Sequence, residues 1–275
     1  MSIQNTKLAV GLFGFGVVGE GLYQTLTQTP GLDATIKKIC IRQPDIARNA
    51  PQELFTTDAD SLLNDPGINV IIELTNDPEA AFRIVTTAFL QGKHVISAGK
   101  KMIAENLEAL LDLQKKHQVS FLYEGAACAS IPVIRNLEEY YDNDLLHAVS
   151  GIVNGSTNYI LTRIFDESLD IETALLQAQI AGFAETDPSL DIEGTDAAHK
   201  LVILLLHAYG LRTHISDFLY SGITGIHEED ARYAREKGYR IRLVAQSRKQ
   251  EDGSVAAFVL PQFVGKDSQL YTVND

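Results

Sequence analysis

A chain of 275 residues is long enough for one large domain or two ordinary domains with sizeable cores. Its net charge of −13 argues against a nucleic-acid partner and against an anionic membrane surface, because both require basic patches. Two cysteines, no signal-peptide pattern and no apolar run of spanning length predict a cytoplasmic protein without a disulfide framework.

The first predicted element is a buried strand at residues 7–12, which leads into a G-x-G-x-x-G motif and then a helical pattern. In a dinucleotide site the first glycine permits the tight turn, the second lets the backbone approach the pyrophosphate, and the third lets the helix pack against the strand. A glycine-rich turn without a ligand is the alternative, but the order of strand, motif and helix favours cofactor binding. The predicted cofactor-binding turn consists of Gly14, Phe15, Gly16, Val17, Val18 and Gly19.

The second predicted strand, residues 35–41, bears on the choice between NAD and NADP. NAD-binding proteins commonly place an acidic residue at this strand end, where it binds the ribose 2′-hydroxyl. Here Arg42 follows the strand. A cation suits a 2′-phosphate, so NADP is favoured over NAD. A solvated arginine is the alternative, and both cofactors remain open.

Strands and helices continue to alternate as far as residue 123: we predict strands at 69–74, 94–97 and 120–123, and helices at 78–93 and 105–116. Asp77 is predicted to cap the first of these helices. The short links predict a doubly wound, Rossmann-type parallel sheet, which binds ligands at the carboxyl ends of its strands. The polar residues predicted at these ends are Thr75, Asn76, Ser97 and Lys100. Lys100 would reach the nicotinamide side of the site, and a surface pair with Lys101 is the alternative.

The second half of the chain predicts a different architecture. A run of small residues at 124–132 allows close approach of another element or of an ion held by carbonyl oxygens, and packing is the default expectation. The further predicted helices are at 132–141, 159–165, 171–180 and 228–237, and the strands are at 147–153, 218–223, 240–246 and 255–260. The sequence therefore predicts an α/β protein, with a Rossmann domain over residues 1–135 and an α+β domain over residues 136–275.

The polar segment 184–200 carries the candidate chemistry. Its carboxylates include Glu185, Asp191 and Asp196, and it ends at Lys200. A helix is predicted to begin immediately before Asp196, so Asp196 and Lys200, four residues apart, share one face. Alone, that spacing is typical of an exposed ion pair of little energetic value. Beside a nucleotide site with no acid–base group of its own, it predicts a catalytic and substrate-binding segment.

The sequence resembles the homoserine dehydrogenase family. The matching segments, in family order and over nearly the whole chain, are GFGVVG, IIELTND, SAGKKMIAEN, YEGAACASIPVI, GIVNGSTNYILT and AGFAETDPSLDIEGTDAAHK. The resemblance implies a homodimer that interconverts L-homoserine and L-aspartate 4-semialdehyde with NAD or NADP, a step in threonine, methionine and isoleucine biosynthesis. It also implies that a nucleotide-binding domain is followed by a substrate-binding, catalytic and dimerisation domain.

The resemblance assigns roles to matching positions. Lys200 takes the place of the proton donor or acceptor, and Lys100 that of a second catalytic lysine beside the nicotinamide. Glu185 and Asp196 match residues that bind the substrate amino group, with Asp191 as a supporting carboxylate. The remaining implied positions are Thr157 in the substrate site, Gly182 at the cofactor–substrate junction, and the backbone carbonyls of Glu124, Ala127, Ala129 and Ile131 around a sodium ion.

Three departures from the family pattern leave alternatives open. Gly99 stands where an asparagine is usual before the lysine, and Phe183 replaces a common tyrosine. Family members also continue with a glycine-rich stretch and a helix that returns to the nucleotide domain, and we expect this segment to be missing here. The alternatives are a truncated or impaired nucleotide-binding homologue and a related amino-acid dehydrogenase.

Overall fold

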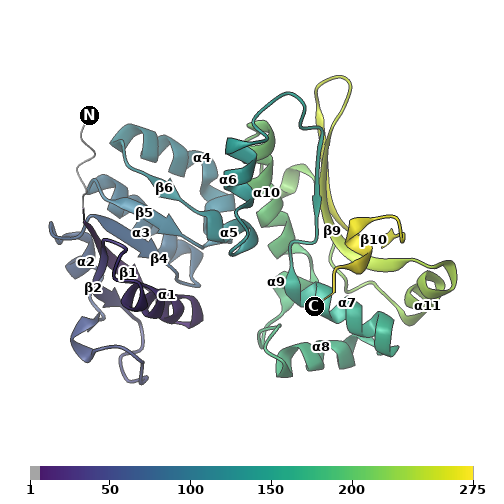
Figure 1. Cartoon of the computed structure of the whole chain (residues 1–275), viewed down its shortest axis with the longest axis horizontal. Helices are drawn as coiled ribbons and strands as arrows, with labels where there is room; N and C mark the ends of the chain where they lie inside the picture. Colours follow the sequence, from purple (N-terminus) through teal and green to yellow (C-terminus); the bar gives the residue numbers. More distant parts are fainter. Residues whose placement is uncertain (1–6, 275) are drawn as a thin grey trace. The chain divides into compact units, whose positions relative to one another are not determined.

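The computed structural model describes residues 7–274, and the chain divides into two compact units after Ser130. The first unit is built on a six-stranded sheet and the second on a four-stranded sheet (Figure 1). Each unit has its own cluster of buried hydrophobic side chains, so each can be understood as a separately packed body.

The first sheet is parallel throughout. Its strands are β1 (Leu8–Phe13), β2 (Ala34–Cys40), β3 (Phe55–Thr56), β4 (Val70–Glu73), β5 (His94–Ser97) and β6 (Phe121–Leu122). They lie in the order β3-β2-β1-β4-β5-β6. The chain therefore adds strands on one side of β1 first and then, from β4 on, on the other side. This is the strand order of a doubly wound dinucleotide-binding sheet, with its ligand crevice beside the end of β1. The predicted fold of the N-terminal half is confirmed.

The first four helices of this unit connect strands, and the fifth follows the last strand. They are α1 (Val17–Gln28), α2 (Asp60–Leu63), α3 (Pro78–Leu90), α4 (Lys100–His117) and α5 (Glu124–Cys128). Asp77 caps α3 as predicted, because its side chain accepts a hydrogen bond from the Ala80 N–H. The predicted start of α4 at residue 105 is wrong, since the helix begins at Lys100. Asn106 has non-helical dihedral angles, so the helix consists of two segments on either side of a kink, and the predicted start lies next to this kink.

The second unit packs helices against a mixed sheet. The strands are β7 (Ala148–Gly151), β8 (Leu219–Tyr220), β9 (Arg240–Lys249) and β10 (Val255–Val264), in the order β7-β9-β10-β8. The helices are α6 (Val133–Glu139), α7 (Gly155–Glu167), α8 (Ile171–Ile180), α9 (Ser189–Ile192), α10 (Thr195–Tyr209) and α11 (Glu228–Lys237). The long β9–β10 hairpin forms the centre of the sheet, and side chains of α7, α8, α10 and α11 share its core. An α+β second domain is thus confirmed.

Two polar segments of this unit contain more helix than the sequence predicts. The residues that precede the predicted helix at 159–165 form the first turn of α7, which starts at Gly155 with Asn154 as its cap. The Asn154 side chain accepts a hydrogen bond from the Thr157 N–H, so the polar run satisfies the helix end. The short helix α9 lies within the polar segment 184–200, before α10.

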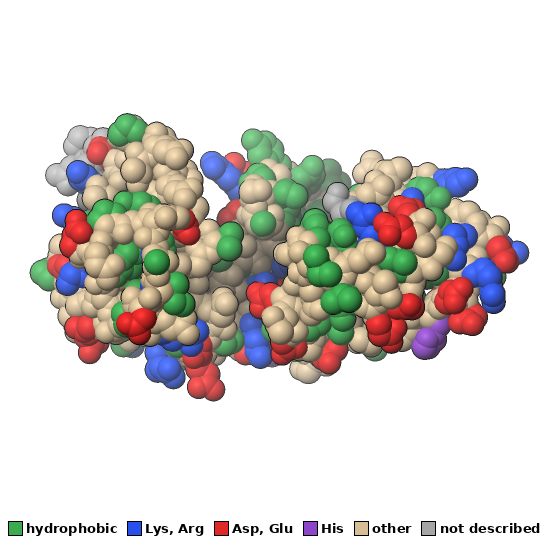
Figure 2. Space-filling view, turned by 90° about the horizontal axis from the view of Figure 1, so that it is seen from below, with side chains coloured by type: hydrophobic (Ala, Val, Ile, Leu, Met, Phe, Trp, Pro, Cys, Tyr) green, Lys and Arg blue, Asp and Glu red, His purple; other side chains and the backbone are tan. Residues whose placement is uncertain are grey.

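Charged side chains of both signs are interspersed on the face shown in Figure 2. Over residues 7–274, no helix is long and apolar enough to cross a membrane. Within the same range, no group of three or more His, Cys, Asp or Glu side chains is arranged to hold a metal ion.

Candidate functional site

The glycine turn after β1 has the geometry that a pyrophosphate group requires. Gly14 has φ +91°, and a Cβ there would lie 2.6 Å from the Leu74 carbonyl oxygen. A Cβ at Gly19 would lie 2.5 Å from the Gly14 carbonyl oxygen, so only glycine lets α1 pack this closely. By contrast, a Cβ at Gly16 would meet no atom within 4 Å. The first and third glycines serve the fold, while the space beside the second is open to a ligand.

The N-terminus of α1 lies directly beside that open space. Gly16 is the residue before the helix and contributes no capping side chain. Val17 and Val18 in the first turn are 92% and 63% exposed, so the turn is accessible. Backbone N–H groups at a helix N-terminus attract anions. The predicted turn therefore fits the pyrophosphate of a dinucleotide.

Arg42 lies just beyond the end of β2 and forms an ion pair with Asp77, with 3.7 Å between Nη1 and Oδ2. The arginine side chain is 74% exposed, so this pair contributes little stability. The pKa of Asp77 lies below its ordinary value, chiefly because the Ala80 N–H donates to the carboxylate and also because Arg42 is near. A 2′-phosphate at this strand end would compete with Asp77 for the guanidinium.

The ends of β4 and β5 are joined by a side chain that the sequence analysis overlooked. Glu73, the last residue of β4, is fully buried and accepts hydrogen bonds from Thr75 and Ser97. The predicted cofactor residues Thr75 and Ser97 are thus tied to one carboxylate. The signal was present in the sequence, because a strand of three apolar residues ends in an acid. Asn76, by contrast, is exposed and has no part in this network.

Lys100 is the first residue of α4 and is half-buried. Its N–H donates to the Ala98 carbonyl oxygen at 2.9 Å, which tightens the turn between β5 and α4. Since Lys100 belongs to the first unit and Lys200 to the second, each lysine is placed by its own unit.

The carbonyls implied around a sodium ion fall on two short segments. Glu124 and Ala127 lie in α5, and Ala129 follows it with φ +52°. Ile131 begins the second unit, where its carbonyl oxygen accepts a hydrogen bond from the Val133 N–H. The small-residue run therefore forms a helix and a left-handed turn, and the sodium site stays a prediction.

The strongest polar cluster of the second unit surrounds Asn154. The Asn154 amide nitrogen donates to Asp191 Oδ1 at 2.7 Å and to Asp196 Oδ2 at 2.9 Å. Its amide oxygen accepts from the Thr157 N–H and hydroxyl. Lys200 Nζ lies 2.8 Å from Asp196 Oδ2. The predicted residues Thr157, Asp191, Asp196 and Lys200 are thus brought together. Asn154 is the common partner of the first three, and Lys200 joins the cluster through Asp196.

Lys200 is held at two points within this cluster. Its ammonium donates to the Val153 carbonyl oxygen at 2.6 Å as well as to Asp196. The Lys200 and Asp196 side chains are 15% and 3% exposed, so the alternative of an exposed ion pair is wrong. A largely buried ammonium with one fixed carboxylate is a suitable acid–base group, because its position does not depend on solvent.

Two other predicted positions lie outside the cluster. The Glu185 side chain is exposed, and the residue's backbone carbonyl accepts a hydrogen bond from Gln179. Gly182 has φ +79° and ends the turn after α8. The next residue, Phe183, stacks on Tyr159 with ring centroids 4.4 Å apart. An aromatic ring at Phe183 is therefore retained by packing, although the tyrosine hydroxyl common in the family is absent.

The polar run 154–158, between a predicted strand and a predicted helix, predicts a helix cap, and Asn154 is that cap. Its contacts to the two carboxylates were not predicted. The two contacts to Asp191 and Asp196 span 37 and 42 residues, so local sequence cannot reveal them.

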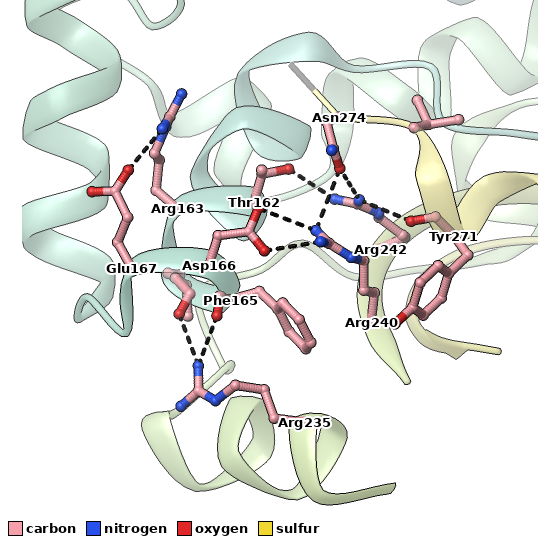
Figure 3. Close-up of polar contacts among 12 residues, drawn as sticks. Thr162, Arg163, Phe165, Asp166, Glu167, Arg235, Arg240, Arg242, Tyr271 and Asn274 are labelled. Atoms are coloured by element: carbon pink, nitrogen blue, oxygen red, sulfur yellow. Dashed lines mark hydrogen bonds and ion pairs between the residues drawn. The ribbon is translucent and has the colours of Figure 1, made fainter. Parts of the chain in front are cut away.

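A second network fixes α7 from strand β9 (Figure 3). Arg242 is 1% exposed and donates to the side chains of Asn158 and Thr162 on α7. It also donates to Asn274, while Arg240 pairs with Asp166 at 2.9 Å. The helix that begins at the Asn154 cluster is thereby anchored along its length.

A doubly wound sheet with this glycine turn, followed by a unit with a buried lysine–carboxylate cluster, defines a two-part protein of the dinucleotide-binding α/β class. The profile described as "Homoserine dehydrogenase, NAD binding domain" matches residues 14–124, and the profile "Homoserine dehydrogenase" matches residues 132–275. The chain belongs to the homoserine dehydrogenase family, and the resemblance found in the sequence is confirmed.

Individual relatives support the same family assignment. Homoserine dehydrogenase of Synechocystis sp. is 34% identical over 96% of this chain and 64% of its own length. A crystal structure of a homoserine dehydrogenase from Thiobacillus denitrificans superposes with a TM-score of 0.89, at 32% identity, over 97% of this chain and 64% of that one. A hyperthermophilic archaeal homoserine dehydrogenase mutant in complex with NADPH gives 0.78 at 25% identity, over 98% and 86%. The chain thus spans slightly less than two thirds of the length of the first two.

Proposed function

We propose that this chain contains the nucleotide-binding and catalytic parts of an NAD(P)-dependent oxidoreductase that interconverts L-homoserine and L-aspartate 4-semialdehyde. The observation that carries the proposal is the buried Lys200, held by Asp196 and the Val153 carbonyl in a family that shares this segment. Its first unit, corresponding to the predicted domain 1–135, would hold the cofactor, and its second, corresponding to 136–275, the amino-acid substrate.

The first unit offers a place for each part of a dinucleotide. The turn from Gly14 to Gly19 and the N-terminus of α1 would hold the pyrophosphate, and Arg42 a 2′-phosphate. Thr75 and Ser97 would lie on the nicotinamide side. Bound NAD or NADP would supply the hydride acceptor or donor. NADPH in the archaeal relative supports NADP, and NAD remains the alternative.

The second unit would supply the proton transfer. When the alcohol is oxidised its hydroxyl proton must leave with the hydride, so an acid–base group is needed within hydrogen-bond reach. Lys200 would accept this proton in oxidation and return it in reduction. Asp196 and the Val153 carbonyl fix the nitrogen of Lys200 so that it need not search for its position. Lys100 is proposed as the second lysine, beside the reacting oxygen.

Carboxylates of the same segment would orient the substrate. Homoserine carries an ammonium group, and Asp196 and Glu185 are proposed to bind it, with Asp191 supporting Asp196 through Asn154. Thr157 lies in the same cluster. The substrate would then be held at its charged end, leaving the hydroxyl-bearing carbon free to react.

The test is homoserine-dependent reduction of NAD and of NADP, measured in parallel with the purified chain. We expect turnover with at least one nucleotide, and equilibrium binding of the same nucleotide without substrate. Binding without turnover would instead support an impaired nucleotide-binding homologue, which Gly99 in place of asparagine favours. Turnover only with another amino-acid substrate would support a related dehydrogenase. A homodimer and a bound sodium ion are also proposed from the family resemblance, and a cytoplasmic location is proposed from the sequence composition.

A further inference from the structure

Glu73 is a buried carboxylate at the edge where ligands bind in a doubly wound sheet. Its side chain is 0% exposed. The Thr75 N–H and hydroxyl donate to Oε1 at 2.6 and 2.7 Å, and the Ser97 hydroxyl donates to Oε2 at 2.7 Å. Glu73 and Ser97 are paired in register as the last residues of neighbouring strands. One carboxylate therefore holds the two loops that leave β4 and β5.

The Glu73 carboxyl group has hydrogen-bond donors around it but no cationic partner. All three donors are uncharged groups, and over the described range 7–274 no lysine or arginine forms an ion pair with Glu73. An ionised carboxylate accepts hydrogen bonds only, and the three contacts are compatible with this state. Because burying an ion without a counter-ion is costly, an ionised carboxylate here would favour a ligand that carries a positive charge.

The topology places Glu73 on the nicotinamide side of the crevice. The glycine turn follows β1, and the ribose position that bears the 2′-hydroxyl or 2′-phosphate lies at the end of β2. The other half of a dinucleotide must then extend over β4 and β5, on the opposite side of β1. Glu73 pairs in register with Phe13, immediately before the glycine turn. The nicotinamide ring carries a positive charge when oxidised and none when reduced.

We propose that Glu73 is ionised and is a positioning residue for the nicotinamide half of the cofactor, and that its charge makes the site favour the oxidised over the reduced nucleotide. This inference rests on the proposed function, because it requires that the chain bind NAD or NADP. Two unit charges within about 10 Å, at an effective dielectric constant of about 20 to 40, change an affinity about fivefold or more.

The loop before α4 is built around the same carboxylate. The Gly99 N–H donates to Ser97 Oγ at 3.0 Å, which continues the network to the start of α4 and Lys100. A Cβ at Gly99 would lie 3.1 Å from Glu73 Oε2 and 3.3 Å from Ser97 Oγ. Both contacts are tight, so the glycine found here in place of the family's asparagine leaves room for the hydrogen-bonded side chains of Glu73 and Ser97.

The experiment measures dissociation constants of the oxidised and reduced nucleotides, for NADP and NAD, by calorimetry and by NAD(P)H fluorescence. In Glu73→Gln the shape is kept and the charge removed, so the oxidised form should lose about fivefold or more in affinity relative to the reduced form. Ser97→Ala is the matched control. It removes a hydrogen bond but keeps the charge, so it should change both affinities by the same factor and leave their ratio unchanged.

An unchanged ratio in folded Glu73→Gln would overturn the inference while leaving the proposed function intact. If that variant does not fold, Glu73→Met combined with Ser97→Ala removes the charge together with one donor. The affinity for the oxidised nucleotide should then fall relative to that for the reduced nucleotide by the same factor. Wild-type protein that binds neither redox form would overturn both the inference and the proposed function. Wild-type protein that binds both forms but shows no turnover would overturn the proposed catalysis alone.

Discussion

The ligand edge of the first unit and the polar cluster of the second are built on opposite principles. The glycine turn offers a ligand backbone N–H groups and space, since Gly16 leaves room where a side chain would lie. The cluster around Asn154 instead consists of charged side chains at fixed distances: the amide joins two carboxylates, and one of these pairs with an ammonium. The first arrangement suits a ligand common to many proteins, and the second suits a particular substrate and a proton transfer.

The largest effect is expected in the second unit, from Lys200→Ala. If this lysine transfers the proton, turnover should fall about 10²- to 10⁴-fold, while the dissociation constant of the nucleotide stays unchanged because the cofactor is held by the first unit. Steady-state kinetics and nucleotide titration give the two values. Lys116→Ala, at an exposed lysine in the last turn of α4, is the control and should alter neither. Equal losses of turnover and nucleotide affinity in a folded Lys200→Ala protein would contradict the assignment.

The next largest effect is expected in the glycine turn, where one glycine should affect nucleotide affinity and another the stability of the fold. Gly16→Ala places a methyl group where no protein atom lies within 4 Å, so the unfolding free energy should be unchanged while nucleotide affinity falls about tenfold or more. Gly14→Ala, at φ +91° and against the Leu74 carbonyl, should lower stability by about 2 kcal/mol or more. Thermal unfolding and nucleotide titration separate the two. Full nucleotide affinity in Gly16→Ala would show that the pyrophosphate lies elsewhere.

These contrasts also show what the sequence could predict. The parallel sheet, the glycine turn and the Asp77 cap depend on local patterns, and each is found as predicted. The contacts of Asn154 and the role of Glu73 were missed, because they depend on segments distant in the chain, or on burial that a single acid after an apolar strand only suggests. The predicted start of α4 lies next to a kink instead of at the helix N-terminus. Sequence therefore predicts elements better than the polar groups that join them.

A smaller effect is expected at Asn154, which tests whether the stability of the second unit depends on the charges of the two carboxylates that Asn154 joins. Asn154→Ala leaves Asp191 and Asp196 without the shared donor, and should lower the unfolding free energy by about 1 to 3 kcal/mol. Asn154→Asp keeps the size but places a third carboxylate beside the other two, so its loss of stability should be greater at neutral pH and diminish on acidification. Urea unfolding at several pH values measures both. Equal stability of the two variants at every pH would show that Asn154 contributes only its cap.

The smallest effect compares one helix cap in each unit. The pKa of Asp170, the cap of α8, is lowered chiefly by the Thr173 N–H, and that of Asp77, the cap of α3, chiefly by the Ala80 N–H. Each carboxylate has a lower pKa folded than unfolded, so its stabilisation is present above the ordinary value of 3.8 and is lost as the pH falls through the lower, folded pKa. Asparagine keeps the cap without titrating, so the stability difference between wild type and Asp170→Asn should disappear in acid.

Asp77→Asn should show the same trend and a further dependence on salt near neutral pH, because only Asp77 is also paired with an arginine, Arg42. Thermal unfolding across pH and ionic strength measures both, and identical salt responses would mean that Arg42 is free to meet a phosphate at no cost to α3.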